Sequence, residues 1–211
     1  MTLYTNLISK GGPIMWIIAA GAVLLLFIFL KKVFQFHREE INVREFLRGL
    51  FNVLKRNGYV EAITLCDNTP GPVAKILGAA ILARERGDED IRRAIDEAAL
   101  EEIPKLERHV QVLSTIAFVM PLLGFVGTVL GMMEAFQAAT RDGGKFLSAA
   151  SIAGAVDSAL ITTAAALITA IPAYIAYNYL VARIQSMTLD MEKAALEILN
   201  FFENHSGEDE K

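Results

Sequence analysis

The chain has 211 residues, of which 54% are hydrophobic, and a formal net charge of −4 at pH 7. An average soluble domain is about 45–50% apolar, so this composition is too apolar for an ordinary soluble protein. The small net charge indicates no polyanionic partner such as nucleic acid, and the single cysteine, Cys66, excludes an internal disulfide.

Residues 1–13 are predicted to form a short lead before the first apolar segment, residues 14–30. About 20 apolar residues, with a range of about 17–25, cross a bilayer, so this segment predicts a first transmembrane helix. Trp16 suits the membrane interface. A cleaved signal peptide is the alternative, but Lys31 and Lys32 follow the apolar run instead of preceding it.

Residues 31–109 are predicted to form a helical region between the first two spans. The periodicity of Val33–Leu54 predicts a helix that continues directly out of the membrane. Further helices are expected over Tyr59–Cys66, over Val73–Arg86 and from Ile91 onward. Asp88 is the expected N-cap of the last helix, and Pro104 should break or kink it. Acidic and basic residues are balanced here, which favours a solvated helical bundle.

The second span is predicted over residues 110–133. It contains Pro121 and the glycines Gly124, Gly127 and Gly131, whose spacing lets a neighbouring helix come close. Thr128 adds a hydroxyl to an otherwise apolar helix. Two interpretations stay open: a packing seam whose hydroxyls bond their own backbone, or a polar path.

The third span is predicted over residues 149–181, after a short connection at residues 134–148. On a helical wheel, Ser158 and Thr162 share one small, hydroxylated side with Ser151 and Thr169, whereas Thr163 lies on another side. Pro172 falls on the small side. Asp157 is the one charged residue of the span, and an ionisable group at such depth is a functional candidate. Its structural alternatives are pairing with Arg141 or Lys145, or contact with water on the outer side.

Residues 182–211 are predicted to be a C-terminal amphipathic helix and a charged tail. Most lysines and arginines fall in residues 31–109. The positive-inside rule therefore places this region and the C-terminus in the cytoplasm, with the N-terminus and the 134–148 connection outside. The three histidines lie outside the apolar spans and far apart in the sequence, so no metal site, cofactor site or intramembrane Ser/His dyad is predicted. We predict an all-α membrane protein with three transmembrane helices and no enzymatic activity.

Three motifs give the chain a resemblance to the MotA/TolQ/ExbB proton channel family. They are GGPIMW (residues 11–16), PLLGFVGTVLGM (residues 121–132), and ALITTA followed by AIPAYIAYN (residues 159–164 and 170–178). Three spans and a modest cytoplasmic insert resemble the ExbB and TolQ branches more than MotA, and ExbB is preferred.

The resemblance implies a homo-pentamer in the bacterial inner membrane, with the second and third spans lining a central pore. The pore would hold the helices of an ExbD- or TolR-like single-span partner that carries one essential aspartate. Proton flow would drive motion that a TonB-like protein delivers to outer-membrane transporters. The family's polar pore threonines correspond to Thr128 and Thr163, and its prolines to Pro121 and Pro172.

One departure concerns the glutamate that the ExbB and TolQ branches carry just before the ALITTA run. Ser158 stands at that position here, and the acid, Asp157, lies one residue earlier. Either Asp157 takes over the role or the role is absent. Within the family a TolQ-like part in the Tol-Pal envelope system is the alternative function. A non-conducting membrane scaffold is the alternative from another class.

Overall fold

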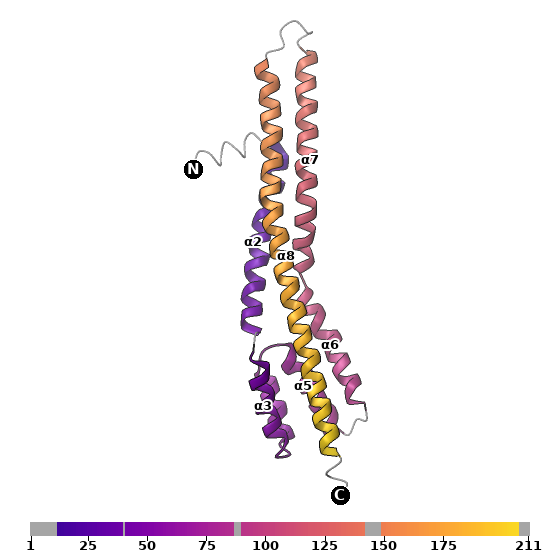
Figure 1. Ribbon diagram of the computed structural model, residues 1–211. Coiled ribbons are helices and arrows are strands. Elements are labelled where there is room, and N and C mark those ends of the chain that lie inside the picture. Colours follow the sequence, from indigo (N-terminus) through magenta and orange to yellow (C-terminus); the bar gives the residue numbers. More distant parts are fainter. Residues whose placement is uncertain (1–11, 40, 87–89, 142–148, 207–211) are drawn as a thin grey trace. The chain divides into compact units, whose positions relative to one another are not determined.

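The computed structural model describes residues 12–39, 41–86, 90–141 and 149–206, and every regular element in these ranges is a helix (Figure 1). The predicted all-α fold is confirmed. The helices are α2 (Gly12–Glu39), α3 (Val43–Leu54), α4 (Tyr59–Asn68), α5 (Pro72–Arg86), α6 (Ile91–Glu107), α7 (Val110–Arg141) and α8 (Ala149–Ser206). Residues 1–11 of the lead and residues 142–148 of the connection lie outside the described ranges.

Three helical stretches have the length and apolar composition needed to cross a membrane. They are Gly12–Leu54, Ile91–Gln137 and Ala153–His205, and each contains one of the predicted spans. The chain is therefore a multi-pass membrane protein with shorter helices between its first and second spans.

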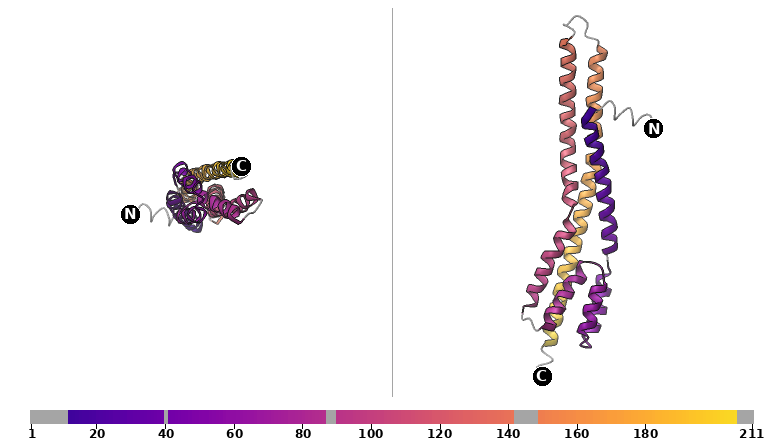
Figure 2. Two further views of the ribbon diagram at one scale, coloured as in Figure 1. Left: turned by 90° about the horizontal axis from the view of Figure 1, so that it is seen from below. Right: turned by 180° about the vertical axis from the view of Figure 1, so that it is seen from behind.

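The chain divides into two compact units, the first of which comprises Met1–Lys31 and His109–Tyr179. Within it, α7 and the first part of α8 run side by side in both ribbon views (Figure 1, Figure 2). The α2 helix contacts both partners: a methyl group on Gly21 would collide with Met120 of α7, and the Phe29 ring lies edge-on to Tyr179 of α8 at 6.4 Å. The three predicted spans fall in this unit, except for the last two residues of the third.

The second unit comprises Lys32–Arg108 and Leu180–Lys211. Its core is apolar and fully buried, with Leu50, Ile76, Leu77, Ile81, Met191 and Ile198 at its centre. The Phe51 ring of α3 stacks on Phe201 of α8 at 4.9 Å. The Lys75 ammonium of α5 forms a salt bridge with the Glu102 carboxylate of α6 at 3.1 Å, which joins these two helices.

The helix predicted to continue unbroken from Val33 to Leu54 is interrupted in the structure. The α2 helix ends at Glu39, and α3 begins at Val43 after Asn42, whose backbone is extended. The Asn42 side chain accepts a hydrogen bond from the backbone N–H of Glu45 at 3.4 Å. An asparagine that caps a new helix start in this way stops the preceding helix, because the same residue cannot stay helical.

The start and end of α6 also differ from the prediction. Its N-cap is Asp90, which accepts from the backbone N–H of Arg93 at 3.0 Å, while the predicted cap Asp88 lies outside the described residues. Pro104 does not break the helix, which continues to Glu107. The chain turns instead at His109, whose φ of 69° lies in the left-handed region. Because a proline has no N–H, α6 lacks the hydrogen bond that residue 104 would otherwise donate to the carbonyl of Leu100.

The last two helices are longer than the predicted spans. The α7 helix runs on to Arg141, and α8 continues without interruption from Ala149 to Ser206. The predicted amphipathic C-terminal helix is therefore the second half of α8 and not a separate element.

Candidate functional site

Three glycines of α7 face the small residues of α8 at close range. A methyl group on Gly124 would lie 2.8 Å from Ala166 Cβ, and one on Gly131 would lie 2.6 Å from Ala159 Cβ. A methyl group on Gly127 would lie 2.7 Å from Thr162 Cγ2. Carbon atoms in contact need about 3.5–4.0 Å, so only glycine allows the two helices to approach this closely.

Thr163 joins the two helices by a hydrogen bond. Its Oγ1 donates to the backbone carbonyl of Gly124 at 2.9 Å and also lies 3.3 Å from the carbonyl of Ala159 on its own helix. The absence of a side chain at Gly124 leaves this carbonyl open to a neighbouring helix. A hydroxyl that the wheel placed away from the small face thus reaches across to α7.

Thr128 lies one turn beyond Gly124 on α7 and is half-buried. Its Oγ1 donates to the carbonyl of Phe125 at 2.7 Å. Thr163 and Thr128 therefore bind the carbonyls of two consecutive residues, Gly124 and Phe125, on one turn of α7. The two accepting carbonyls lie at one level of α7 but about 100° apart around its axis, so the two hydroxyls bind different sides of the same turn.

Thr162 is only 3% exposed, and it lies in the seam against Gly127. Its hydroxyl donates to the carbonyl of Ser158 at 2.9 Å. Thr169, 8% exposed, donates in the same way to Ala165 at 3.0 Å. In the single chain Thr162 is thus a packing residue of the seam, with its hydroxyl satisfied by its own helix.

Asp157 and Ser158 lie at neighbouring positions on α8 but differ in exposure. Asp157 is exposed on the surface of the chain, whereas Ser158 is half-buried. Both lie more than one turn before Thr163 along α8, so Asp157 is not part of the cluster around Gly124. Its carboxylate is the only acidic side chain in the described residues of the predicted third span.

Both predicted helix prolines are inside helices. Pro121 is half-buried in α7, and Pro172 is exposed on α8. A proline has no N–H, so each leaves the carbonyl four residues earlier without its helical donor. Pro172 also lines an apolar groove of about 470 Å³ against α2, together with Leu25, Leu26, Phe29, Ile175, Ala176 and Tyr179.

The chemistry of this region is that of hydroxyls and backbone carbonyls. In the described part of the chain no cluster of 3 or more His, Cys, Asp or Glu side chains is arranged to hold a metal ion. Sequence reasoning identified the glycines and threonines but not the bond from Thr163 to Gly124. A helical wheel shows the faces of a single helix, whereas this bond depends on how α7 and α8 pack against each other.

A model of the MotA/TolQ/ExbB proton channel family matches residues 68–193, which is more than half of the chain. The match includes the second and third spans and the glycine–threonine cluster. This family consists of channel proteins and not of enzymes, in agreement with the prediction of no enzymatic activity.

Relatives from both branches are similar to the chain. A biopolymer transport ExbB homolog of Methanothermobacter thermautotrophicus is 27% identical over 180 residues, which cover 85% of this chain and 63% of that protein. The Tol-Pal system protein TolQ of Haemophilus influenzae is 42% identical over 98 residues, 46% of this chain and 42% of the relative. ExbB of Xanthomonas campestris is 32% identical over 114 residues, which cover 54% of this chain and 44% of that protein. The chain thus spans less than two thirds of the length of these relatives.

Proposed function

Because the chain belongs to the MotA/TolQ/ExbB proton channel family, we propose that it is an ExbB-like subunit of a proton-driven motor in the bacterial inner membrane. Its N-terminus would lie in the periplasm and its C-terminus in the cytoplasm. The motor would convert proton flow into mechanical work that a TonB-like protein delivers to outer-membrane transporters.

The proposal rests on the polar cluster at one level of α7. Thr163 and Thr128 bind the consecutive carbonyls of Gly124 and Phe125 within an apolar helix pair. A proton that crosses lipid needs a titratable group and a hydroxylated or wet path, because an isolated charge in hydrocarbon is very costly. The cluster supplies such a path but no acid.

The titratable group would come from a partner. We propose that an ExbD- or TolR-like single-span helix brings one aspartate to the level of Thr128 and Thr163. These hydroxyls would solvate the aspartate in its charged state and release it when it is protonated. Asp157 and Ser158 would line the outer part of the path, and Thr162 would hold the seam. The driving energy is about 2.3 kcal/mol per charge per 100 mV, plus any pH gradient.

Exposed apolar surface supports assembly into the homo-pentamer that we propose. On α8, Ile168 and Ile175 are 71% and 63% exposed, and Leu189 and Leu196 are 53% and 54% exposed. In each of the two units the exposed pair is spaced by seven residues, so the two members of each pair lie on one side of their part of α8. Such spacing is typical of helices that pack along one another. Leu189 and Leu196 lie beyond the predicted third span, so a neighbouring subunit would cover them there.

A TolQ-like part in the Tol-Pal system is the second candidate function. It is favoured by the 42% identity to TolQ over 98 residues, which exceeds the identity to the ExbB relatives. The longer matched stretch of the ExbB homolog, 180 residues, favours the ExbB-like part. Deletion of the gene distinguishes the two functions. Loss of energy-dependent import would indicate the ExbB-like function, whereas a leaky outer membrane and chained cells would indicate the TolQ-like function.

The test replaces both hydroxyls while keeping side-chain shape. In Thr128→Val/Thr163→Val, energy-dependent uptake should fall to background, while the mass of the purified assembly and its companion protein stays unchanged. Thr115→Val is a matched control, because Thr115 is an exposed residue of α7 whose hydroxyl donates to its own helix at Gln111. Normal uptake by the double variant would reject the ion path and leave the scaffold as the remaining function.

A further inference from the structure

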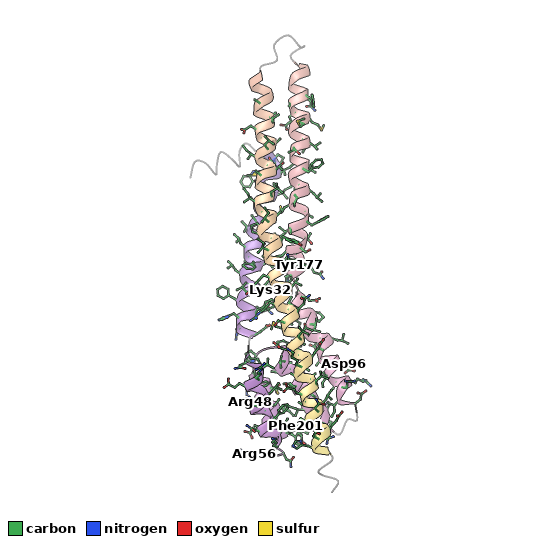
Figure 3. The ribbon with its side chains drawn as sticks, viewed as in Figure 1. Lys32, Arg48, Arg56, Asp96, Tyr177 and Phe201 are labelled. Carbon is green, nitrogen blue, oxygen red and sulfur yellow. The ribbon has the colours of Figure 1, made fainter. Side chains whose placement is uncertain are left out.

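The two lysines that end the first apolar segment have different surroundings. Lys31 is exposed, whereas Lys32 is only 4% exposed. Figure 3 labels Lys32 on α2. A lysine is almost never fully buried unless its ammonium group is satisfied. The positive-inside rule treats both residues alike, as charges that stay on the cytoplasmic side. The burial of Lys32 next to an exposed Lys31 indicates that Lys32 has an additional role.

The ammonium of Lys32 binds the C-terminal end of α6. Its Nζ donates to the carbonyl of Leu106 at 2.8 Å and lies 3.4 Å from the carbonyl of Lys105. The same nitrogen is 5.3 Å from the centre of the Phe36 ring, a cation–π distance. The two contacts with α6 join residues that are more than seventy positions apart in the sequence.

The position on α6 explains why a cation is favoured there. The last four carbonyls of a helix have no helical donor, and the aligned peptide dipoles give that end a partial negative charge. The α6 helix ends at Glu107, so Lys105 and Leu106 carry two of these carbonyls. The side chain of Lys105 itself turns away to Glu101 and Glu102, at 2.7 and 2.8 Å.

We infer that Lys32 is a positioning residue that caps α6 from α2 and so holds the part of α2 that follows the first apolar segment to the end of the helical insert. The cap is supplied by a different helix, at the point where the chain leaves the insert. Lys31 remains free for the membrane surface. This inference goes beyond the proposed function and does not depend on it.

The test measures hydrogen exchange of the full-length protein in mild detergent. In Lys32→Met, which keeps most of the apolar stem, the backbone amides of the last turn of α6 should exchange at least about tenfold faster, since hydrogen bonds to charged groups stabilise measurably. The buried amides of α5 should exchange as in the wild type. Lys31→Met is the matched control and should leave both regions unchanged.

A second measurement uses the wild type and is independent of how well a variant folds. With a limiting amount of an amine-acylating reagent, Lys31 should be modified at least about tenfold faster than Lys32, because the Lys32 ammonium is buried and engaged. Equal modification of the two lysines, or equal exchange of the α6 end in Lys32→Met and Lys31→Met, would overturn the inference.

Discussion

At the scale of residues, the proposed ion path depends on two hydroxyls. Thr163 lies on α8, yet its hydroxyl is held by a carbonyl of α7, and Thr128 binds the next carbonyl along α7. The two side chains are therefore fixed at one level by backbone atoms. Valine has the shape of threonine without the hydroxyl, so replacement removes this chemistry with little change in packing.

Cys66 of α4 gives a prediction at the same scale. Burial, and secondly the charge of Asp67, raises the pKa of the Cys66 thiol from 9.0 to about 12. At pH 8 iodoacetamide should therefore modify Cys66 about a thousandfold more slowly in the folded protein than in denaturant, since only the thiolate reacts. Mass spectrometry of the intact chain measures this rate. Comparable rates in the two states would show that the thiol is accessible.

The sign of the linked pH effect follows from the same shift. The folded pKa lies above the unfolded one, so the stability that Cys66 contributes is fully present below pH 9 and is lost as the pH rises toward 12. The difference in unfolding midpoint between wild type and Cys66→Ala should accordingly shrink above pH 9.

The residues of the site were more predictable than their contacts. Gly124, Gly127, Gly131, Thr128 and Thr163 stand out in the sequence, because glycines and hydroxyls are unusual in an uncharged span. The bond from Thr163 to Gly124 does not, because the wheel places Thr162 and not Thr163 on the small face of α8. The local sequence does not contain the angle at which two helices cross.

At the scale of elements, the apolar periodicity predicted the helices, and local capping decided their ends. Asn42 interrupts the helix expected between Val33 and Leu54, and Asp90 starts α6. Pro104 did not act as a breaker, because α6 continues past it to Glu107. Helix existence depends on many residues, whereas a boundary depends on one or two side chains, and so the boundaries were less predictable.

The contact of α7 with α8 predicts the effect of a single methyl group. In Gly131→Ala the new Cβ would lie 2.6 Å from Ala159 Cβ and 3.2 Å from the carbonyl of Ala155, neither of which can rotate away. Overpacking of this kind costs about 1–3 kcal/mol. The thermal unfolding midpoint in mild detergent should fall.

Gly154→Ala is the matched control for this experiment. Gly154 also lies in a helix of the membrane-spanning unit, but a methyl group there would meet no atom within 4 Å. Because alanine is the better helix former by up to about 1 kcal/mol, its midpoint should stay or rise. A midpoint for Gly131→Ala equal to that of Gly154→Ala would contradict the close approach of α7 and α8.

At the scale of the whole molecule, one chain leaves much apolar surface uncovered. Lipid can cover the exposed side chains of the spans, and Leu189 and Leu196, which lie beyond the predicted third span, are exposed as well. The composition predicted a membrane protein, and the structure supports this with three helices of sufficient length. The number of copies and the identity of a companion are properties of the assembly, and neither the sequence nor the single chain contains them.

The most direct test of the proposed ion path asks what lies against Thr128 in the membrane. A photoreactive amino acid placed at position 128 should, on irradiation of intact membranes, form an adduct with a small single-span protein whose helix carries an aspartate. Mass spectrometry of the adduct identifies the neighbour, and unsubstituted protein is the blank. Adducts with lipid alone would contradict the account, because the titratable group would then have no route to the hydroxyls.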